Sequence, residues 1–220
     1  MKKGIIWSYS KGEFVIFDHY YFSTLYQYIN ENFKLEIPTK FSELIKIANK
    51  QDFELIIFNY PEKPFTNNQI NSILELFNQG KKIIFLTYYK NEDNSSQIVN
   101  SIISKVGLKI NYDEVVDFHQ NHDNDKYLIT TSKIHDKLKS EVKKIIMPCT
   151  STISIEKNKD YIYEVLVKTE SEEKIIAAQA NNKKGKIIAF GTCVFWDNFS
   201  ISLYDNFQFT KNLINYCLEV

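Results

Sequence analysis

Short runs of consecutive apolar residues recur along the chain, and they alternate with segments whose apolar residues follow a helical spacing. The clearest runs cover residues 55–58, 83–86 and 187–190, and each ends in a polar or aromatic segment. Because these runs show no polar alternation, they are typical of strands buried on both faces of a parallel sheet. Similar patterns predict strands at 4–9, 14–17 and 35–37.

Between the runs, apolar residues recur at spacings of three and four and predict helices at 22–33, 41–48, 70–77, 98–106 and 209–217. Thr66 and Gln69 form the pattern of a capping box, and Gly80 marks the helix end. The alternation of strands and helices predicts an α/β fold with a mainly parallel sheet and helices on both faces.

Residues 111–182 interrupt this rhythm. The strand-like runs there are 115–118, 127–129, 145–147, 152–155, 161–168 and 174–180. The last two flank a polar turn and predict an antiparallel hairpin. We expect a single α/β domain over residues 1–220, in which 111–182 form an irregular, β-rich, antiparallel extension of the sheet.

Composition narrows the class of ligand. The 27 basic and 27 acidic residues of this 220-residue chain cancel, so we expect neither nucleic acid nor a membrane as a partner. Every basic residue is Lys, and the bidentate anion clamp that Arg provides is absent. The three cysteines show no CxxC spacing, so no disulfide framework, metal site or cofactor is expected. No apolar run suits a signal peptide or a membrane span, which predicts a cytoplasmic protein.

Three groups of residues carry a family resemblance. They are Phe17-Asp18-His19; residues 55–60 and 64–66 followed by 80–85; and residues 185–191 followed by 206–209 and 212–216. Together they resemble the GIFT-type domain of intraflagellar-transport and gliding-motility-associated proteins, on the class I glutamine amidotransferase-like scaffold related to flavodoxin. The resemblance implies a three-layer fold and a non-catalytic binding or assembly role.

The chain departs from that family after the last predicted strand. Where the family often has Gly-Asp-Ser-Asp-Phe, this chain has Thr192, Cys193 and Val194 before Phe195. The nucleophile motif Gly-x-Cys-x-Gly of an amidotransferase occurs nowhere, and the run 83–86 ends in Thr87-Tyr88.

In open α/β sheets, ligands bind beyond the carboxyl ends of the strands. This rule selects nine candidate binding residues, with Trp196 and Asp197 close to them: Asp18, His19, Tyr20, Asn59, Tyr60, Thr87, Tyr88, Thr192 and Cys193.

Two of these positions could carry catalysis, and each has a structural alternative. Asp18 and His19 could form an acid/base pair, or Asp18 could cap the next helix while His19 bonds locally; the second is favoured because no nucleophile is evident. Cys193 could be a reactive thiol or a small buried hydrophobe, and the latter is the commoner role of a free cysteine. Cys149 and Cys217 are assigned to the core. The polar segment 119–126 is assigned to a solvated loop because its His and Asp spacing matches no metal motif.

The sequence leaves three functional hypotheses. The preferred one is a non-catalytic domain that binds a small molecule, with carbohydrate among the candidates, or a protein partner at the strand-end rim. The second is a small hydrolase or transferase that uses Asp18, His19 and Cys193. The third is an assembly module, including a homo-oligomer, in which exposed aromatic residues form the interface.

Overall fold

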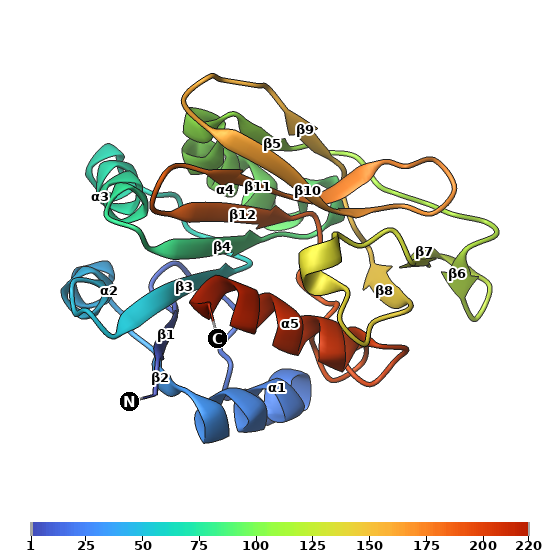
Figure 1. Cartoon of the computed structure of the whole chain (residues 1–220), viewed down its shortest axis with the longest axis horizontal. Helices are drawn as coiled ribbons and strands as arrows, with labels where there is room; N and C mark the ends of the chain where they lie inside the picture. The colour runs from blue at the N-terminus through green and yellow to red at the C-terminus, as the bar shows by residue number, and fades with distance from the viewer. Residues whose placement is uncertain (1, 220) are drawn as a thin grey trace.

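The protein is built on one seven-stranded sheet that is parallel over most of its width (Figure 1). The computed structural model describes residues 2–219. Five neighbouring strands are parallel; in spatial order they are β12 (Lys186–Phe190), β4 (Lys82–Leu86), β3 (Phe53–Asn59), β1 (Gly4–Trp7) and β2 (Lys34–Glu36). An antiparallel hairpin of β10 (Ile162–Lys168) and β11 (Ile175–Asn181) extends the β12 edge. The α/β fold with a mainly parallel sheet and an antiparallel extension is therefore confirmed.

Helices pack against the sheet as two groups, which enclose two hydrophobic clusters (Figure 1). The first cluster joins the sheet to α1 (His19–Asn32) and α5 (Asn206–Leu218). The second joins it to α2 (Phe41–Ala48), α3 (Asn67–Asn78) and α4 (Ser95–Ile103). On β4, Ile84 belongs to the first cluster and its neighbour Ile83 to the second. Because successive side chains of a strand point to opposite faces, both faces of the sheet are covered.

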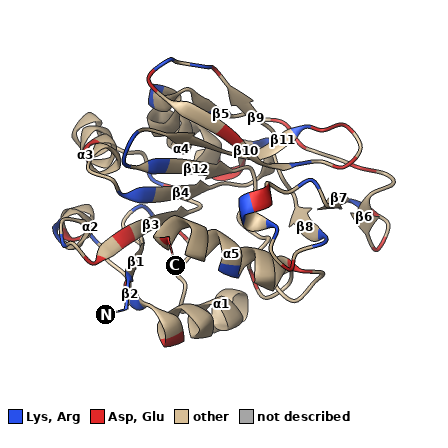
Figure 2. Ribbon diagram, in the orientation of Figure 1, with Lys and Arg blue, Asp and Glu red and all other residues tan. Residues whose placement is uncertain are grey.

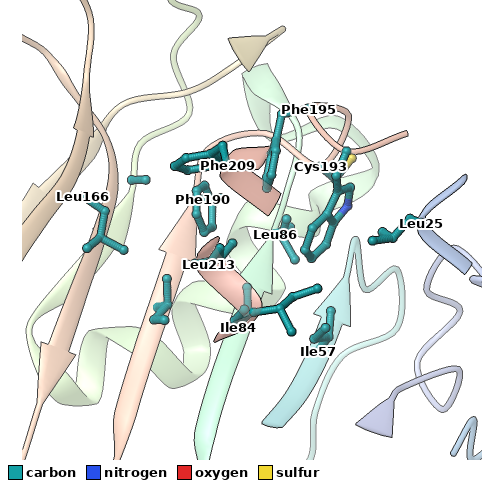
Figure 3. Close-up of a cluster of buried hydrophobic side chains, with 14 of the residues drawn as sticks. Leu25, Ile57, Ile84, Leu86, Leu166, Phe190, Cys193, Phe195, Phe209 and Leu213 are labelled. Carbon is teal, nitrogen blue, oxygen red and sulfur yellow. The ribbon is translucent and has the colours of Figure 1, made fainter. Parts of the chain in front are cut away.

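The first cluster shows how segments distant in the sequence meet over one face of the sheet. Figure 3 shows Leu25 of α1 and Leu213 of α5 gathered with Ile84 of β4 and Phe190 of β12. All four side chains are completely buried. Such burial stabilises the fold by roughly 1.5–3 kcal/mol for each large apolar side chain.

Helix starts follow local capping chemistry. The predicted capping box of α3 is present, because Thr66 accepts from the Gln69 N–H and Gln69 reaches back to the Thr66 N–H. Helix α1 begins earlier than the spacing predicted, since the Asp18 carboxylate accepts from the Tyr20 N–H at 2.9 Å and caps it. None of the helices within residues 2–219 has the length and apolarity to cross a membrane.

The predicted strand at 14–17 is wrong. Gly12 turns the chain with φ of +77°, and the Phe14 carbonyl then accepts from the Trp7 indole N–H at 2.7 Å. The segment also donates from the Phe14 N–H to the carbonyl of Asn59, at the end of β3. It therefore covers the sheet end as an irregular loop in which Ile16 is buried and Phe17 is 51% exposed.

The middle region is only in part an extension of the main sheet. Two smaller antiparallel sheets form there, one of β5 (Leu108–Ile110) with β9 (Ile153–Ile155), the other of β6 (Asn121–His122), β7 (Asp125–Thr131) and β8 (Ile145–Pro148). Short 3₁₀ turns complete the chain: η1 (Tyr89–Asn94), η2 (Ser104–Val106) and η3 (Asp136–Leu138). The predicted strand at 115–118 does not form, because Asp117 instead closes a turn by accepting from the His119 and Gln120 N–H groups.

Gly191 allows the end of β12 to approach the segment that follows β8. Its carbonyl accepts from the Ser151 N–H at 3.0 Å. A Cβ atom at Gly191 would clash with the Ser151 carbonyl oxygen and lie 2.7 Å from Thr150 Oγ1. The close contact therefore depends on the missing side chain.

We expect Gly191→Ala to lower the free energy of unfolding by at least about 2 kcal/mol, since a backbone carbonyl cannot move away as a side chain can. Urea denaturation measures this. The control is Gly80→Ala, where an added Cβ has no neighbour nearer than 3.6 Å and the cost is left-handed backbone strain alone, roughly 1 kcal/mol. Equal losses at the two positions would contradict the argument.

Candidate functional site

Three parallel strands deliver their carboxyl ends to the same edge of the sheet. Leu86, the last residue of β4, is paired with Asn59 of β3 on one side and with Phe190 of β12 on the other. The residues that follow these strands must therefore lie close together, as the rule for open α/β sheets predicts. Of the predicted residues, Tyr60, Tyr88 and Cys193 line one cleft there.

The cleft has a volume of about 270 Å³. Its lining residues are Phe14, Tyr60, Glu62, Tyr88, Glu92, Asp93, Cys193 and Val194. Aromatic rings and a thiol form one part of this surface, and three carboxylates form the other. The cleft is thus both aromatic and acidic.

Tyr60 fixes the aromatic part. Its ring stacks on Phe14 with centroids 5.0 Å apart and planes 8° apart, and it meets Tyr88 edge to face at 6.3 Å. Its hydroxyl donates to Asp93 Oδ2 at 2.9 Å. Burial, together with the Asp93 carboxylate, raises the pKa of Tyr60 far above its usual value, so the phenol stays neutral. Its left-handed backbone (φ +65°) is uncommon for a bulky residue and turns the chain sharply out of β3.

Cys193 is a buried, protonated thiol. It is 1% exposed, and burial followed by the nearby Asp197 carboxylate raises its pKa well above the usual value. Because the thiolate is the reactive form, this environment suppresses nucleophilic chemistry. The structure thus places Cys193 in the buried role that the sequence favoured.

The residues before and at the start of α1 lie apart from this cleft lining. Asp18 is occupied as the helix cap, and His19 is exposed and contacts the ring of Tyr26 at 6.3 Å. Within residues 2–219, no hydrogen bond joins His19 to Cys193. Tyr20 is 66% exposed. The predicted acid/base pair is therefore not assembled with a nucleophile.

The other predicted residues are buried behind the cleft. Thr192 donates from its hydroxyl to the Pro148 carbonyl at 2.5 Å. The Thr87 N–H donates to the Phe190 carbonyl at 3.3 Å. Asn59 is completely buried, and its side-chain amide makes no hydrogen bond within the described chain. The two threonines thus tie the strand ends together rather than line the cleft.

The sequence did not identify the acidic part of the cleft. Glu62 lies in the loop after β3, and Glu92 and Asp93 lie in η1 after β4. The one feature of the sequence that indicates a site role for these acids is their position, since each follows a predicted strand within a few residues. Exposed loop acids are ordinarily solvated, so this signal carried little weight before the structure was known.

A second recess of about 250 Å³ adjoins the cleft and shares Tyr88 and Val194 with it. Cys149 and Asp197 also line this recess. Cys149 is half-buried with a left-handed backbone (φ +48°), so its assignment to the core was incomplete. Burial raises its pKa as well. Among residues 2–219, no group of three or more His, Cys, Asp or Glu side chains is placed to hold a metal ion.

Comparison with known proteins gives a relative but no activity. No protein-family model matches the chain. An uncharacterized protein of Aquifex aeolicus (strain VF5) is 36% identical over 227 residues, covering 96% of this chain and 92% of the relative. The chain belongs to the family of that Aquifex protein.

Solved structures support the fold of this family. The N-terminal domain of mmIFT52 superposes with a TM-score of 0.81 at 16% identity, covering 99% of this chain and 98% of that one. A cytoplasmic protein from Salmonella typhimurium gives a TM-score of 0.53 at 11% identity, covering 99% and 98%. A β-galactosidase from Bacillus circulans sp. alkalophilus gives 0.56 at 10% identity, where 99% of this chain matches 31% of the enzyme. At these identities the likeness concerns the fold, and at that level the GIFT-type resemblance is supported.

Asp197 in the second recess provides a test of site electrostatics. It is 4% exposed, and burial raises its pKa from the usual 3.8 to about 6. Its Oδ1 accepts from the N–H groups of Phe199 and Ser200, each at 3.0 Å. Because the pKa of Asp197 is higher in the folded state, the protonated side chain contributes stability to the fold. This contribution is fully present below pH 3.8 and is lost as the pH rises through about 6.

We therefore expect Asp197→Asn, which keeps the Oδ1 acceptor, to gain stability relative to wild type as the pH rises from 4.5 to 7.5, by about 1–3 kcal/mol. Chemical denaturation at the two pH values measures the change. Asp205→Asn is the matched control, since Asp205 also accepts from two backbone N–H groups but lies outside the recess. A pH-independent difference between wild type and Asp197→Asn would contradict the assignment.

Proposed function

We propose that the chain is a binding domain whose small-molecule ligand occupies the cleft at the carboxyl ends of β3, β4 and β12. The observation that carries this proposal is the convergence of rings and carboxylates from three strand ends on one concave site. Ligand sites are ordinarily clefts with a mainly apolar lining and a few convergent polar groups. This cleft, at about 270 Å³, is slightly smaller than the usual range of roughly 300–1,000 Å³, and its lining combines apolar residues with three carboxylates.

The proposal includes the finer scaffold, class I glutamine amidotransferase-like and flavodoxin-like. Helices on both faces of a parallel sheet support it, together with a site beyond the strand ends. In an amidotransferase of this scaffold, the nucleophile would follow a strand in a sharp turn. Here Thr87 and Tyr88 follow β4, and neither is paired with a histidine within residues 2–219.

Binding without catalysis is the simplest account of the side chains present. A hydrolase or transferase would need a nucleophile and a base within hydrogen-bond reach, roughly 3 Å. Cys193 is a neutral buried thiol, and Asp18 is engaged as a helix cap. The geometry therefore gives the catalytic alternative no support.

Filling the cleft should abolish binding. We expect Val194→Trp to lower the affinity for any ligand of the cleft by about tenfold or more, because the indole would occupy space that the ligand needs. Amide NMR spectra recorded with a set of small neutral, cationic and anionic molecules provide the measurement. Ligands should shift the signals of Tyr88, Cys193 and Val194 in the wild type.

The control for this substitution is Ile162→Trp, because Ile162 is 69% exposed on the outer strand β10. It should leave binding unchanged. Ligands that bind Val194→Trp as tightly as the wild type would refute the proposal, as would signals that shift only around His19.

A second candidate function, assembly, is favoured by an exposed aromatic cluster of Tyr20, Tyr21 and Phe199. Their exposed fractions are 66%, 38% and 57%, and the ring centroids lie 4.8–6.2 Å apart. Asn198 holds the cluster together, since its side chain donates to the carbonyls of His19 and Tyr20 and its N–H donates to the carbonyl of Tyr21. Exposed aromatic patches with a fixed shape are common at protein interfaces.

If the cluster is an interface for a second copy, wild-type protein should associate with increasing concentration. Phe199→Ser with Tyr20→Ser should then weaken association by about tenfold or more. Sedimentation velocity measures this, with Phe118→Ser as the control because Phe118 is 70% exposed outside the cluster. A wild-type monomer at every concentration would rule out self-assembly.

A further inference from the structure

The three carboxylates of the cleft carry negative charge that no side chain of the described chain neutralises. Glu62, Glu92 and Asp93 form no ion pair within residues 2–219. Glu92 and Asp93 are neighbours on the same turn, and Glu62 lines the same cleft. In a chain with 27 basic and 27 acidic residues, this is a local imbalance at the site.

Lys63 follows Glu62 in the sequence, but it forms no ion pair within residues 2–219 and does not line the cleft. Two further lysines, Lys90 and Lys11, are engaged elsewhere. Lys90 pairs with Glu114 at 2.5 Å and lies over the rings of Tyr89 and Tyr127. Lys11 donates to the Pro64 carbonyl at 2.9 Å and to Gln69 Oε1 at 2.7 Å. Neither ammonium group lines the cleft. The lysines that begin β4 and β12 lie at the opposite ends of the strands, where Figure 2 shows these strands in blue.

The remaining lining suits a cation as well. Tyr60, Tyr88 and Phe14 supply aromatic rings, and the negative face of an accessible ring attracts an ammonium or guanidinium group. The buried thiol of Cys193, whose pKa is raised by burial, adds a neutral, polarisable group to the lining. Carboxylates and aromatic rings therefore make up most of the lining, which contains no Lys.

Other ligand classes fit less well. A phosphate or carboxylate would meet negative charge with no Lys in the lining and no Arg in the chain. A sugar needs an open ring face, but Tyr60 is 4% exposed and its ring is stacked against Phe14. A compact cation needs only one ring contact and one or two carboxylates.

We infer that the cleft recognises a small organic cation, an alkylammonium or alkylguanidinium compound, between the Glu62, Glu92 and Asp93 carboxylates and the partly exposed ring of Tyr88. This inference rests on the proposed function, since it names the ligand class of the same cleft. The volume of about 270 Å³ restricts the ligand to a small molecule.

The test titrates isotope-labelled protein with five probes. Butylamine, butylguanidine, 1-butanol and butyrate are short alkyl compounds that differ in the charge of the head group, and methyl glucoside is the sugar probe. Both cations should shift the amide signals of Tyr88, Cys193 and Val194, and the neutral and anionic probes should not. Added salt should weaken the binding of both cations, because salt screens the attraction between exposed charges.

Two variants locate the charge. Glu92→Gln and Asp93→Asn should each lower the affinity for butylamine by about three- to tenfold, which is the loss expected for one charged hydrogen bond. Asn tolerates the left-handed backbone of Asp93 (φ +50°) and can still accept from the Tyr60 hydroxyl. Glu172→Gln is the control, since it removes the same charge from the turn of the β10–β11 hairpin. It should leave binding unchanged.

The outcomes separate the two claims. If 1-butanol or methyl glucoside binds the cleft as tightly as butylamine, or if both acidic-site variants bind normally, the cation inference is wrong and the binding cleft stands. If no probe binds, the cation inference is also wrong. If butylamine binds with unchanged affinity to Val194→Trp and shifts signals elsewhere, both the inference and the proposed cleft are overturned.

Discussion

The parallel pairing of β12 with β4 is the constraint on which the rest of the molecule depends. It joins residues 186–190 to residues 82–86, so the chain that leaves β4 returns to the sheet through β10 and β11 on the far side of β12. Both strands are buried on both faces, which makes the pairing insensitive to local sequence but dependent on the whole core. Its direct consequence is that the loops after β4 and β12 meet. The cleft exists because the last strand of the chain is inserted between β4 and β11.

The parts of the fold that the sequence predicted are those in which burial leaves a simple pattern. The runs at 55–58, 83–86 and 187–190 became β3, β4 and β12 because parallel strands covered on both sides need apolar residues at every position. The run at 14–17 has the same composition, yet it lies across the sheet end. Apolarity reports burial, and a loop that covers a sheet end is buried too. The deciding contact, from Trp7 to the Phe14 carbonyl, is invisible in a linear pattern.

The site residues that the sequence placed correctly are those that follow a strand which forms, and those placed wrongly follow the predicted strand at 14–17, which does not. Tyr60, Tyr88 and Cys193 follow true parallel strands, and they meet. Asp18 and His19 were selected because they follow a strand that does not form, and they belong instead to a helix start. Glu92 and Asp93 could not be recognised, because an acid in a polar turn looks solvated until the turn is seen to border a cleft. What distinguishes them is the engagement of Lys90 with Glu114, a tertiary contact.

The site has a buried part, where side chains are neutral, and an exposed part, where carboxylates gather. Inside the rim, desolvation raises the pKa values of Cys193, Asp197 and Tyr60, so each group is pushed toward its neutral form. At the mouth, the exposed carboxylates of Glu62, Glu92 and Asp93 form no ion pair within residues 2–219. This arrangement offers little means of activating a nucleophile, and it agrees with the cation recognition proposed above. The packing around the strand ends keeps these groups neutral, because burying an unpaired charge is costly, and this agrees with the proposed binding role.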